Sequence, residues 1–264
     1  MRDVRRIHCA PFFGGYSFGA GRASKSTAVF DPATLSLSAW YRTDYPGSPW
    51  TSTASAGSSG SADSLTEATN PPGSFFVNGK DTADFDGTND RLAASSCPFS
   101  DLTGTISFAA LINFDAIANA INSANPYEDT CLFVDVDGAF GVAVADDTGT
   151  KKLRGFAYTG AAYDIVDLTT ASFGTGAWIA IFAEYNKGAT TFSGGTNNDT
   201  FASGTANGSY SFAGKAMRVG TNYNQTSDFL DGKVAELMWA TSDTITTNRA
   251  NIRSYFNSRY AVST

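Results

Sequence analysis

The sequence predicts an all-β protein in which two antiparallel sheets pack face to face. Apolar side chains occupy every second position from Ile106 to Phe114, which is typical of a strand with one face in a core. Turn signals recur, notably the cluster at 87–90 and the pair Asp137-Gly138, and the chain holds 26 glycines. Hydrophobic residues make up 42% and aromatic residues 13% of the 264 residues, which suffices for a core. We find no obvious linker inside the patterned region and therefore expect one domain.

The first part of the chain divides at about residue 28. Residues 1–28 show neither strand alternation nor helical periodicity, and we interpret them as an extended arm before a domain at 29–264. Alternation over 35–42 predicts the first strand. Residues 46–72 are rich in Ser, Thr, Ala and Gly, with Trp50 and Leu65 as the large apolar side chains. This stretch is interpreted either as a loop packed by Trp50 or as a binding loop on a rigid scaffold.

The rest of the chain predicts further strands and one closing helix. A hairpin is expected from strands at 131–136 and 139–145 around Asp137-Gly138. More strands are predicted at 153–158, 163–168, 177–185, 215–219 and 233–240. Both faces of 177–185 are apolar, so that strand should be central in its sheet. Thr246 is the expected N-cap of the helix, whose apolar face is formed by Ile252, Tyr255, Phe256 and Tyr260.

Three segments of the chain carry a resemblance to a known family. They are the F-D-G-x-x-D-x-L turn at 85–92, the strand TISFAALINFD after it, and the ending LDGKVAELMWATSDTITTNRANIRSYFNSRY. Together they resemble the laminin-G-like, concanavalin A-like jelly-roll domains of bacterial surface proteins and bacteriophage structural proteins. The resemblance covers roughly residues 29–262 and implies a two-sheet antiparallel jelly-roll sandwich with an extended N-terminal arm and one C-terminal helix. The family includes lectins, glycanases and inert structural modules, so it implies a fold more than a function.

The charge of the chain is unevenly distributed. Five basic residues against one acid give residues 1–30 a charge of +4, while the remaining 13 basic and 24 acidic residues give −11. An acidic body argues against nucleic acid as a partner, because phosphate binding needs clustered Lys and Arg. No segment has the roughly 20 consecutive apolar residues of a membrane span, and no secretory leader is recognised.

The sequence predicts no catalytic set. The single histidine, His8, lies in the arm, so a Ser-His-Asp or Cys-His site is not expected in the domain. The E-x-D-x-x-E strand pattern of the family's glycanases is missing, and Glu184 and Glu236 each stand alone in apolar strands. Asp135 and Asp137 form a pair that runs into a tight turn. We expect no enzyme, although two acids from separate strands could still meet.

The sequence leaves open a calcium site and a disulfide bond. Laminin-G-like domains often hold one calcium ion, which leaves a calcium site open at the carboxylates that end strands: Asp86, Asp90, Asp135, Asp137, Asp146 and Asp147. No D-x-D-x-D-G loop is present, which favours solvated turn residues, and no cofactor is expected. The three cysteines are an odd number without C-x-x-C spacing; Cys97 and Cys131 could pair across neighbouring strands, but we expect small buried thiols.

Sugar binding would require exposed aromatic rings and polar groups that read hydroxyls. The candidates are Tyr45, Trp50 and Tyr127 in long loops and the turn Asn222-Tyr223-Asn224. For each aromatic residue the alternative is a structural anchor of its loop.

These observations favour a bacteriophage virion structural protein, in the capsid or the tail, that displays a lectin-like jelly roll for host-surface glycans. It would assemble in the host cytoplasm, form a homo-oligomer, and contact other virion proteins through its arm. The alternatives are a free carbohydrate-binding module and a glycan-processing enzyme. The arm residues expected to anchor it are aromatic or basic: Arg2, Arg5, Arg6, Phe12, Phe13, Tyr16 and Phe18. Too little apolar surface is available for the arm to fold on itself, so we expect it to be ordered against another surface.

Overall fold

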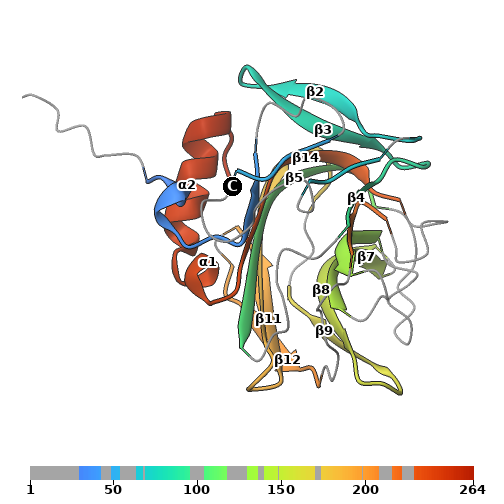
Figure 1. Ribbon diagram of the computed structural model, residues 1–264, viewed down its shortest axis with the longest axis vertical. Coiled ribbons are helices and arrows are strands. Elements are labelled where there is room, and N and C mark those ends of the chain that lie inside the picture. The colour runs from blue at the N-terminus through green and yellow to red at the C-terminus, as the bar shows by residue number, and fades with distance from the viewer. Residues whose placement is uncertain are drawn as a thin grey trace, which may run out of the picture.

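The fold is a sandwich of two antiparallel sheets with two helices on its outer side (Figure 1). The computed structural model describes residues 30–42, 49–53, 64–67, 69–95, 104–117, 130–135, 140–147, 149–169, 174–197, 199–207, 216–221 and 229–264, with backbone alone at 130–135 and 145–147. The predicted arm therefore lies outside the described residues. None of the helices in the described ranges is long and apolar enough to cross a membrane.

The described residues form fourteen strands, one 3-10 turn and two α-helices. In order they are η1 Pro32–Thr34, β1 Ala39–Tyr41, β2 Gly73–Val77, β3 Lys80–Asp86, β4 Leu92–Ala94, β5 Thr105–Ala116, β6 Thr130–Asp135, β7 Phe140–Asp147, β8 Thr150–Tyr158, β9 Tyr163–Asp167, β10 Trp178–Asn186, β11 Thr191–Thr196, β12 Ala202–Thr205, β13 Met217–Val219, β14 Asp231–Ala240, α1 Thr244–Thr247 and α2 Arg249–Tyr260.

The larger sheet has eight strands in the order β12-β11-β10-β5-β14-β3-β2, with β1 also paired to β14. The smaller sheet has six, in the order β4-β13-β6-β7-β8-β9. The predicted hairpin is confirmed, since β6 and β7 pair antiparallel, although its turn residues Asp137 and Gly138 lie outside the described part of the chain. The predicted central position of β10 is also confirmed, because it pairs with β5 on one side and β11 on the other.

Alternation along β5 places one apolar row between the sheets. Ile106, Phe108, Ile112 and Phe114 are buried in this core, as expected. On the opposite face of β5, Ala109 and Leu111 are completely buried as well. They pack in a second apolar cluster together with residues of α2, so the C-terminal helix seals the outer face of the sheet (Figure 1).

A β-bulge in β14 changes which face its side chains reach. The register opposite β5 shifts between Val234 and Glu236, so Ala235 is an extra residue. Val234 and Leu237 face the core between the sheets, whereas Ala235 belongs to the helix-side cluster. Glu236 also faces the helix, because a bulge resets the alternation by one residue. Simple period-two counting cannot anticipate this orientation.

Several sequence expectations need correction. The first strand is shorter than expected, because Pro32–Thr34 forms a 3-10 turn and Leu35 caps it. The closing helix is preceded by the short helix α1, so Thr246 lies inside α1 and Asp243 precedes it. The two apolar faces expected for 177–185 would place Trp178 in the interior as well, but it is only partly buried beside the helix-side cluster.

Candidate functional site

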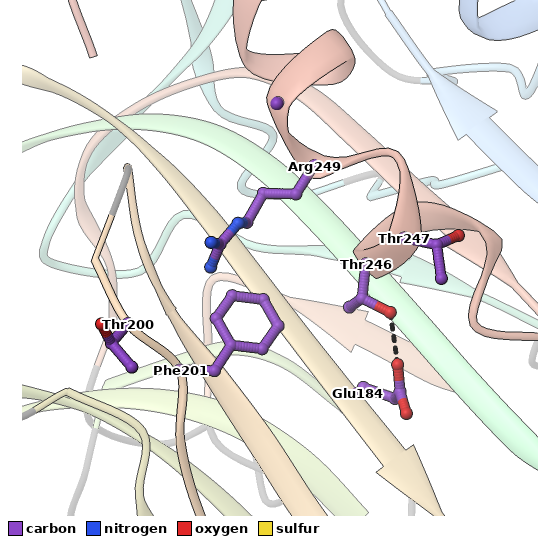
Figure 2. Close-up of a pocket in the computed structure, with 7 residues that line it drawn as sticks. Glu184, Thr200, Phe201, Thr246, Thr247 and Arg249 are labelled. Carbon is purple, nitrogen blue, oxygen red and sulfur yellow. Dashed lines mark hydrogen bonds between the residues drawn. The ribbon is translucent and has the colours of Figure 1, made fainter.

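An open pocket lies where β10 meets the two helices and the connection between β11 and β12. Its volume is about 560 Å³, within the range of small-molecule sites. The described residues that line it are Glu184, Thr200, Phe201, Thr246, Thr247, Arg249 and Ala250 (Figure 2). They combine one carboxylate, one guanidinium, three hydroxyls and one aromatic ring.

The wall made by α1 is held from beneath by β5. The Ser107 hydroxyl, which is buried in that strand, donates to the carbonyl of Ser242 at 2.5 Å. The same oxygen lies 3.3 Å from the amide nitrogen of Ile245, whose side chain is completely buried. The short helix is thereby fixed against the sheet. Thr246 and Thr247 line the pocket from it, and the Thr246 side chain points to Glu184 (Figure 2).

The opposite wall is tied to β10 by a polar turn. Asn197 has φ 46° and donates its backbone N–H to the carbonyl of Ala180 at 2.7 Å. Its side-chain oxygen accepts the N–H of Ala180 at 2.9 Å. One turn residue thus satisfies both backbone groups of Ala180. Asp199 follows in the chain, and its carboxylate accepts from the Thr196 hydroxyl at 2.6 Å, which orders the connection that carries Phe201.

The polar groups of the pocket are held in place by their neighbours. The Thr246 hydroxyl donates to Oε2 of Glu184, and this fixes the orientation of the carboxylate (Figure 2). The guanidinium of Arg249 stacks 4.4 Å above the Phe201 ring. It also donates from Nη1 to the Asp199 carbonyl at 2.9 Å. Since a guanidinium carries five N–H donors, further N–H groups of Arg249 can donate to a ligand in the pocket.

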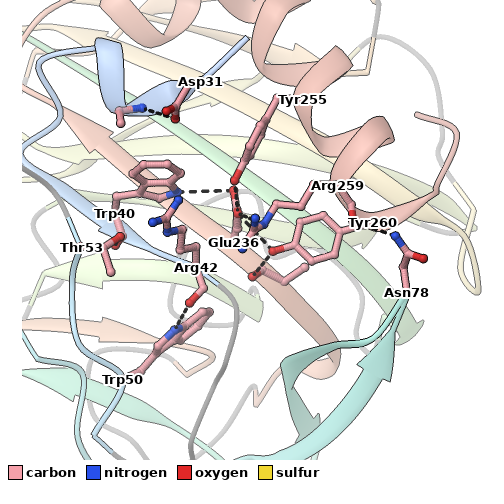
Figure 3. Close-up of polar contacts among 12 residues, drawn as sticks. Asp31, Trp40, Arg42, Trp50, Thr53, Asn78, Glu236, Tyr255, Arg259 and Tyr260 are labelled. Carbon is pink, nitrogen blue, oxygen red and sulfur yellow. Dashed lines mark hydrogen bonds and ion pairs between the residues drawn. The ribbon is translucent and has the colours of Figure 1, made fainter. Parts of the chain in front are cut away.

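The other strand glutamate, Glu236, has a different environment. It is completely buried beneath α2. Its Oε1 accepts from the Tyr255 hydroxyl at 2.8 Å and from the Tyr260 hydroxyl at 3.1 Å, and the Trp40 indole donates to Oε2 at 3.4 Å (Figure 3). Nε of Arg259 lies 3.2 Å from Oε1 as an ion pair. These contacts join the helix to the sheet, and with no exposed surface Glu236 is a structural group.

Burial controls the ionisation of this cluster. It raises the pKa of Glu236 to about 7, against the opposing effects of the Tyr255 hydrogen bond and the charge of Arg259. Burial also raises the pKa of both tyrosine hydroxyls, and the adjacent carboxylate adds to the increase. The tyrosines therefore remain neutral hydrogen-bond donors, as a buried carboxylate requires.

The structure places one of the predicted sugar-binding aromatics in the core. Trp50 is 1% exposed, its indole donates to the Arg42 carbonyl at 3.0 Å, and its ring packs edge-on against Tyr41. This corrects the proposed sugar-stacking role, since a buried ring has no free face, and it favours the loop-anchor interpretation. Tyr45, Tyr127 and Asn222 to Asn224 lie outside the described residues, as do the arm residues named above.

Of the carboxylates considered for calcium, some lie in the described part of the chain and others lie outside it. Asp86 and Asp90 stabilise the turn at 86–90. The Asp86 carboxylate accepts from the backbone N–H of Thr88 at 2.8 Å, and this hydrogen bond lowers the pKa of Asp86. The Asp90 carboxylate accepts from the backbone N–H of Asp86 at 2.9 Å. Burial raises the pKa of Asp90 to about 6. Asp137 and the side chains of Asp135, Asp146 and Asp147 lie beyond the described part. Within that part, no group of three or more His, Cys, Asp or Glu residues is arranged to hold a metal ion.

Sequence reasoning singled out Glu184 and, as a helix cap, Thr246, but it missed the other pocket residues and the pocket itself. Phe201 and Arg249 lie 48 positions apart in segments with no shared motif. The available signal was Glu184 itself, a carboxylate in an otherwise apolar central strand, because such a group requires a polar partner. The sequence did not show that α1 would supply that partner.

Comparisons with known proteins identify the fold. No protein-family model matches the chain, and no curated protein matches it in sequence. Among solved structures, the receptor binding domain of botulinum neurotoxin D has a TM-score of 0.56 at 9% identity, over 83% of this chain and 52% of that one. A native heptameric SAP-like pentraxin from Limulus polyphemus has a TM-score of 0.50 at 11% identity, over 65% and 80%.

A third similar structure is Trypanosoma rangeli sialidase in complex with sialic acid, with a TM-score of 0.51 at 11% identity, over 80% of this chain and 33% of that chain. This chain therefore spans about half of the neurotoxin domain and one third of the sialidase. At these identities the likeness concerns the fold alone. The chain has a lectin-like β-sandwich fold, which confirms the predicted fold class.

Proposed function

We propose that the protein is a non-catalytic glycan-binding module that uses the pocket formed by Glu184, Phe201, Thr246, Thr247 and Arg249. The observation that carries the proposal is the convergence of a carboxylate, a guanidinium, hydroxyls and an aromatic ring in one open cavity. A sugar offers hydroxyls that both donate and accept hydrogen bonds, together with apolar C–H patches. The pocket supplies partners for each of these features.

The arrangement of the groups suggests how a sugar would be read. Oε2 of Glu184 already accepts from Thr246, and each carboxylate oxygen has further acceptor capacity, so a pair of sugar hydroxyls could donate to it. The remaining N–H groups of Arg249 would donate to hydroxyl oxygens. Arg249 covers one face of Phe201, so the sugar would contact the rest of the ring. The fixed orientation of each group reduces the entropy lost on binding.

Two features support binding rather than hydrolysis. Glycosidases of the common types use two carboxyl groups on either side of the scissile bond. Glu184 is the one carboxylate among the described residues that line the pocket, and Glu236 is sealed under α2. The solved structures of similar fold include a sialidase in complex with sialic acid, of which this chain matches one third, and this supports saccharides as the ligand class by analogy of fold.

A glycan array tests this proposal with the full chain. We expect binding to a restricted set of oligosaccharides, and we expect Glu184→Gln to lose most of the signal, because the amide removes the charge and one acceptor. Gln has nearly the same volume, and circular dichroism and melting should show that the variant is folded. Mass spectrometry of the bound sugars after long incubation should show no cleavage. Sugar cleavage by the wild type that Glu184→Gln abolishes would establish an enzyme instead.

We further propose that this module is displayed on a bacteriophage particle. The resemblance to phage jelly-roll domains supports this setting, as does the contrast between the +4 charge of residues 1–30 and the −11 of the remainder. Quantitative mass spectrometry of purified particles from a host that carries the gene is the test. We expect this chain at a fixed stoichiometry to the major capsid or tail protein. Its absence from particles would overturn the setting and leave the sugar-binding proposal intact.

A further inference from the structure

Strand β2 forms an apolar edge of the larger sheet. It ends the path of strands in that sheet, and it carries the large hydrophobic side chains that are most exposed in the described part of the chain: Phe75 at 41% and Phe76 at 67%. The Phe75 ring has the Lys233 ammonium 5.2 Å from its centroid. Among the described residues, no strand pairs with β2 on the side away from β3.

The backbone of β2 is oriented to accept another strand. A two-residue turn, Asn78-Gly79, joins β2 to β3, and both of its residues have positive φ, at 48° and 70°. In such a hairpin the flanking residues Val77 and Lys80 form a hydrogen-bonded pair, and bonding alternates from there. The N–H and C=O groups of Ser74 and Phe76 therefore point away from β3, toward the open edge.

Natural proteins usually protect such an edge with charged residues, proline or a bulge. The sequence of β2 is GSFFV, which contains neither charge nor proline, and its register with β3 runs without a shift. The edge is therefore a template for a partner strand that brings its own apolar side chains.

Charges around the edge indicate what kind of strand fits. Asp81 pairs with Phe76, and Asp84 pairs with Gly73, so carboxylates lie directly beside β2. Asp84 and Asp115 share the ammonium of Lys233. Burial and then the charge of Asp115 raise the pKa of Asp231, against the opposing charge of Lys233. A basic, aromatic strand is the complementary partner.

Such a segment exists in this chain, at residues 1–28. It contains aromatic residues and a surplus of arginines, namely Phe12, Phe13, Tyr16, Phe18, Arg2, Arg5 and Arg6. The segment joins the domain at Phe30, which packs against the same helix-side cluster as Val77, the last residue of β2. A stretch of this length spans roughly 90 Å when extended, whereas α2, which packs in the same helix-side cluster as Phe30 and Val77, is about 18 Å long. The chain's own segment can therefore reach the edge.

We propose that the chain's own N-terminal segment pairs with β2 as an additional strand and covers Phe75 and Phe76. A tethered segment reaches this edge at a millimolar effective concentration, which favours the same molecule over a second copy in dilute solution. The arginines then lie near Asp81 and Asp84, and the aromatic rings lie against the exposed phenylalanines. This inference is independent of the sugar pocket.

Photo-crosslinking of the full chain tests the proposal. Phe76 is replaced by p-benzoylphenylalanine in an equal mixture of unlabelled and ¹⁵N-labelled protein, and cross-linked peptides are identified by mass spectrometry. We expect the probe to link to residues 1–28 within chains of a single label, at monomer mass. The same probe at Thr205, which is exposed on the opposite edge strand β12, should not reach them. Mixed-label dimers would assign the edge to a second copy, and products without the N-terminal segment would remove it as the occupant; either result overturns the proposal.

Hydrogen exchange gives a second readout that does not require the probe. The amides of Ser74 and Phe76 should exchange roughly tenfold more slowly in the wild type than in the full-length variant Arg2→Glu/Arg5→Glu/Arg6→Glu. The amide of Phe75, which is already bonded to β3, should change little and serves as the internal control. Equal exchange rates at Ser74 and Phe76 in the two proteins would contradict the pairing.

Discussion

The buried carboxylate of Glu236 should make the stability of the protein depend on pH in a defined window. Burial raises its pKa from an ordinary 4.5 to about 7 in the folded protein. The folded protein favours the protonated form of Glu236, whereas in the unfolded chain the same side chain ionises above about pH 4.5. The stabilising contribution is therefore complete below about pH 4.5 and is lost as the pH rises toward 7, above which both states are ionised.

The magnitude follows from the separation of the two pKa values. Each pH unit corresponds to about 1.36 kcal/mol, so the interval from 4.5 to about 7 is worth roughly 3 kcal/mol. Other groups also titrate, including Asp90, whose pKa is raised to about 6. A comparison of the wild type with Glu236→Gln isolates the single group, because Gln cannot ionise and the remaining carboxyls are common to both proteins.

Urea unfolding at intervals from pH 4.5 to 8 measures the difference. Relative to Glu236→Gln, the free energy of unfolding of the wild type should fall by roughly 3 kcal/mol across this range and level off above pH 7. Any constant cost of placing an amide beside the Trp40 indole shifts the two curves without changing their relative slope. Parallel curves would show that Glu236 has an ordinary pKa and would refute the reasoning from burial.

Two further substitutions test the packing. Phe108→Ala should cost about 3 to 5 kcal/mol in urea unfolding, because the ring is 1% exposed and its centroid lies 5.2 Å from that of Trp239. The control Thr205→Ala, exposed on the edge strand β12, should stay within about 0.5 kcal/mol. A cost below about 1 kcal/mol at Phe108 would mean that the core is misassigned. Trp50→Ala should likewise lose about 3 to 5 kcal/mol while the folded fraction keeps its glycan affinity, and loss of affinity at full stability would restore Trp50 as a binding residue.

The two-sheet sandwich could be predicted because the spacing of apolar residues within each strand shows which of its faces are buried. The alternation from Ile106 to Phe114 specifies which face of that strand lies in the core, because a shift by one residue would turn the apolar side chains outward. The two apolar faces of 177–185 require packed neighbours on both faces of the sheet. The helix face of Ile252, Tyr255 and Phe256 was equally readable. These features depend on residues close together in sequence, so the sequence alone was sufficient.

The pocket and the Glu236 cluster could not be predicted, because they depend on contacts between distant segments. Glu236 is turned toward α2 by a bulge that leaves no mark in the hydrophobic pattern. Phe201 and Arg249 meet only because the turn at Asn197 is tied to β10. The two roles left open for Trp50 could not be separated for the same reason: a ring in a polar loop fits a binding residue or a loop anchor equally until its bridge partner Leu65 is known.

The affinity of the pocket for an oligosaccharide selected on the array tests the central claim most directly. Isothermal titration should give one site per chain for the wild type, and Phe201→Ala should weaken binding by roughly tenfold, about 1.4 kcal/mol, because the apolar contact and the support of the Arg249 guanidinium are both lost. Phe76→Ala, an exposed phenylalanine away from the pocket, should bind as the wild type does. Unchanged affinity in Phe201→Ala, or an equal loss in both variants, would contradict glycan binding at this site.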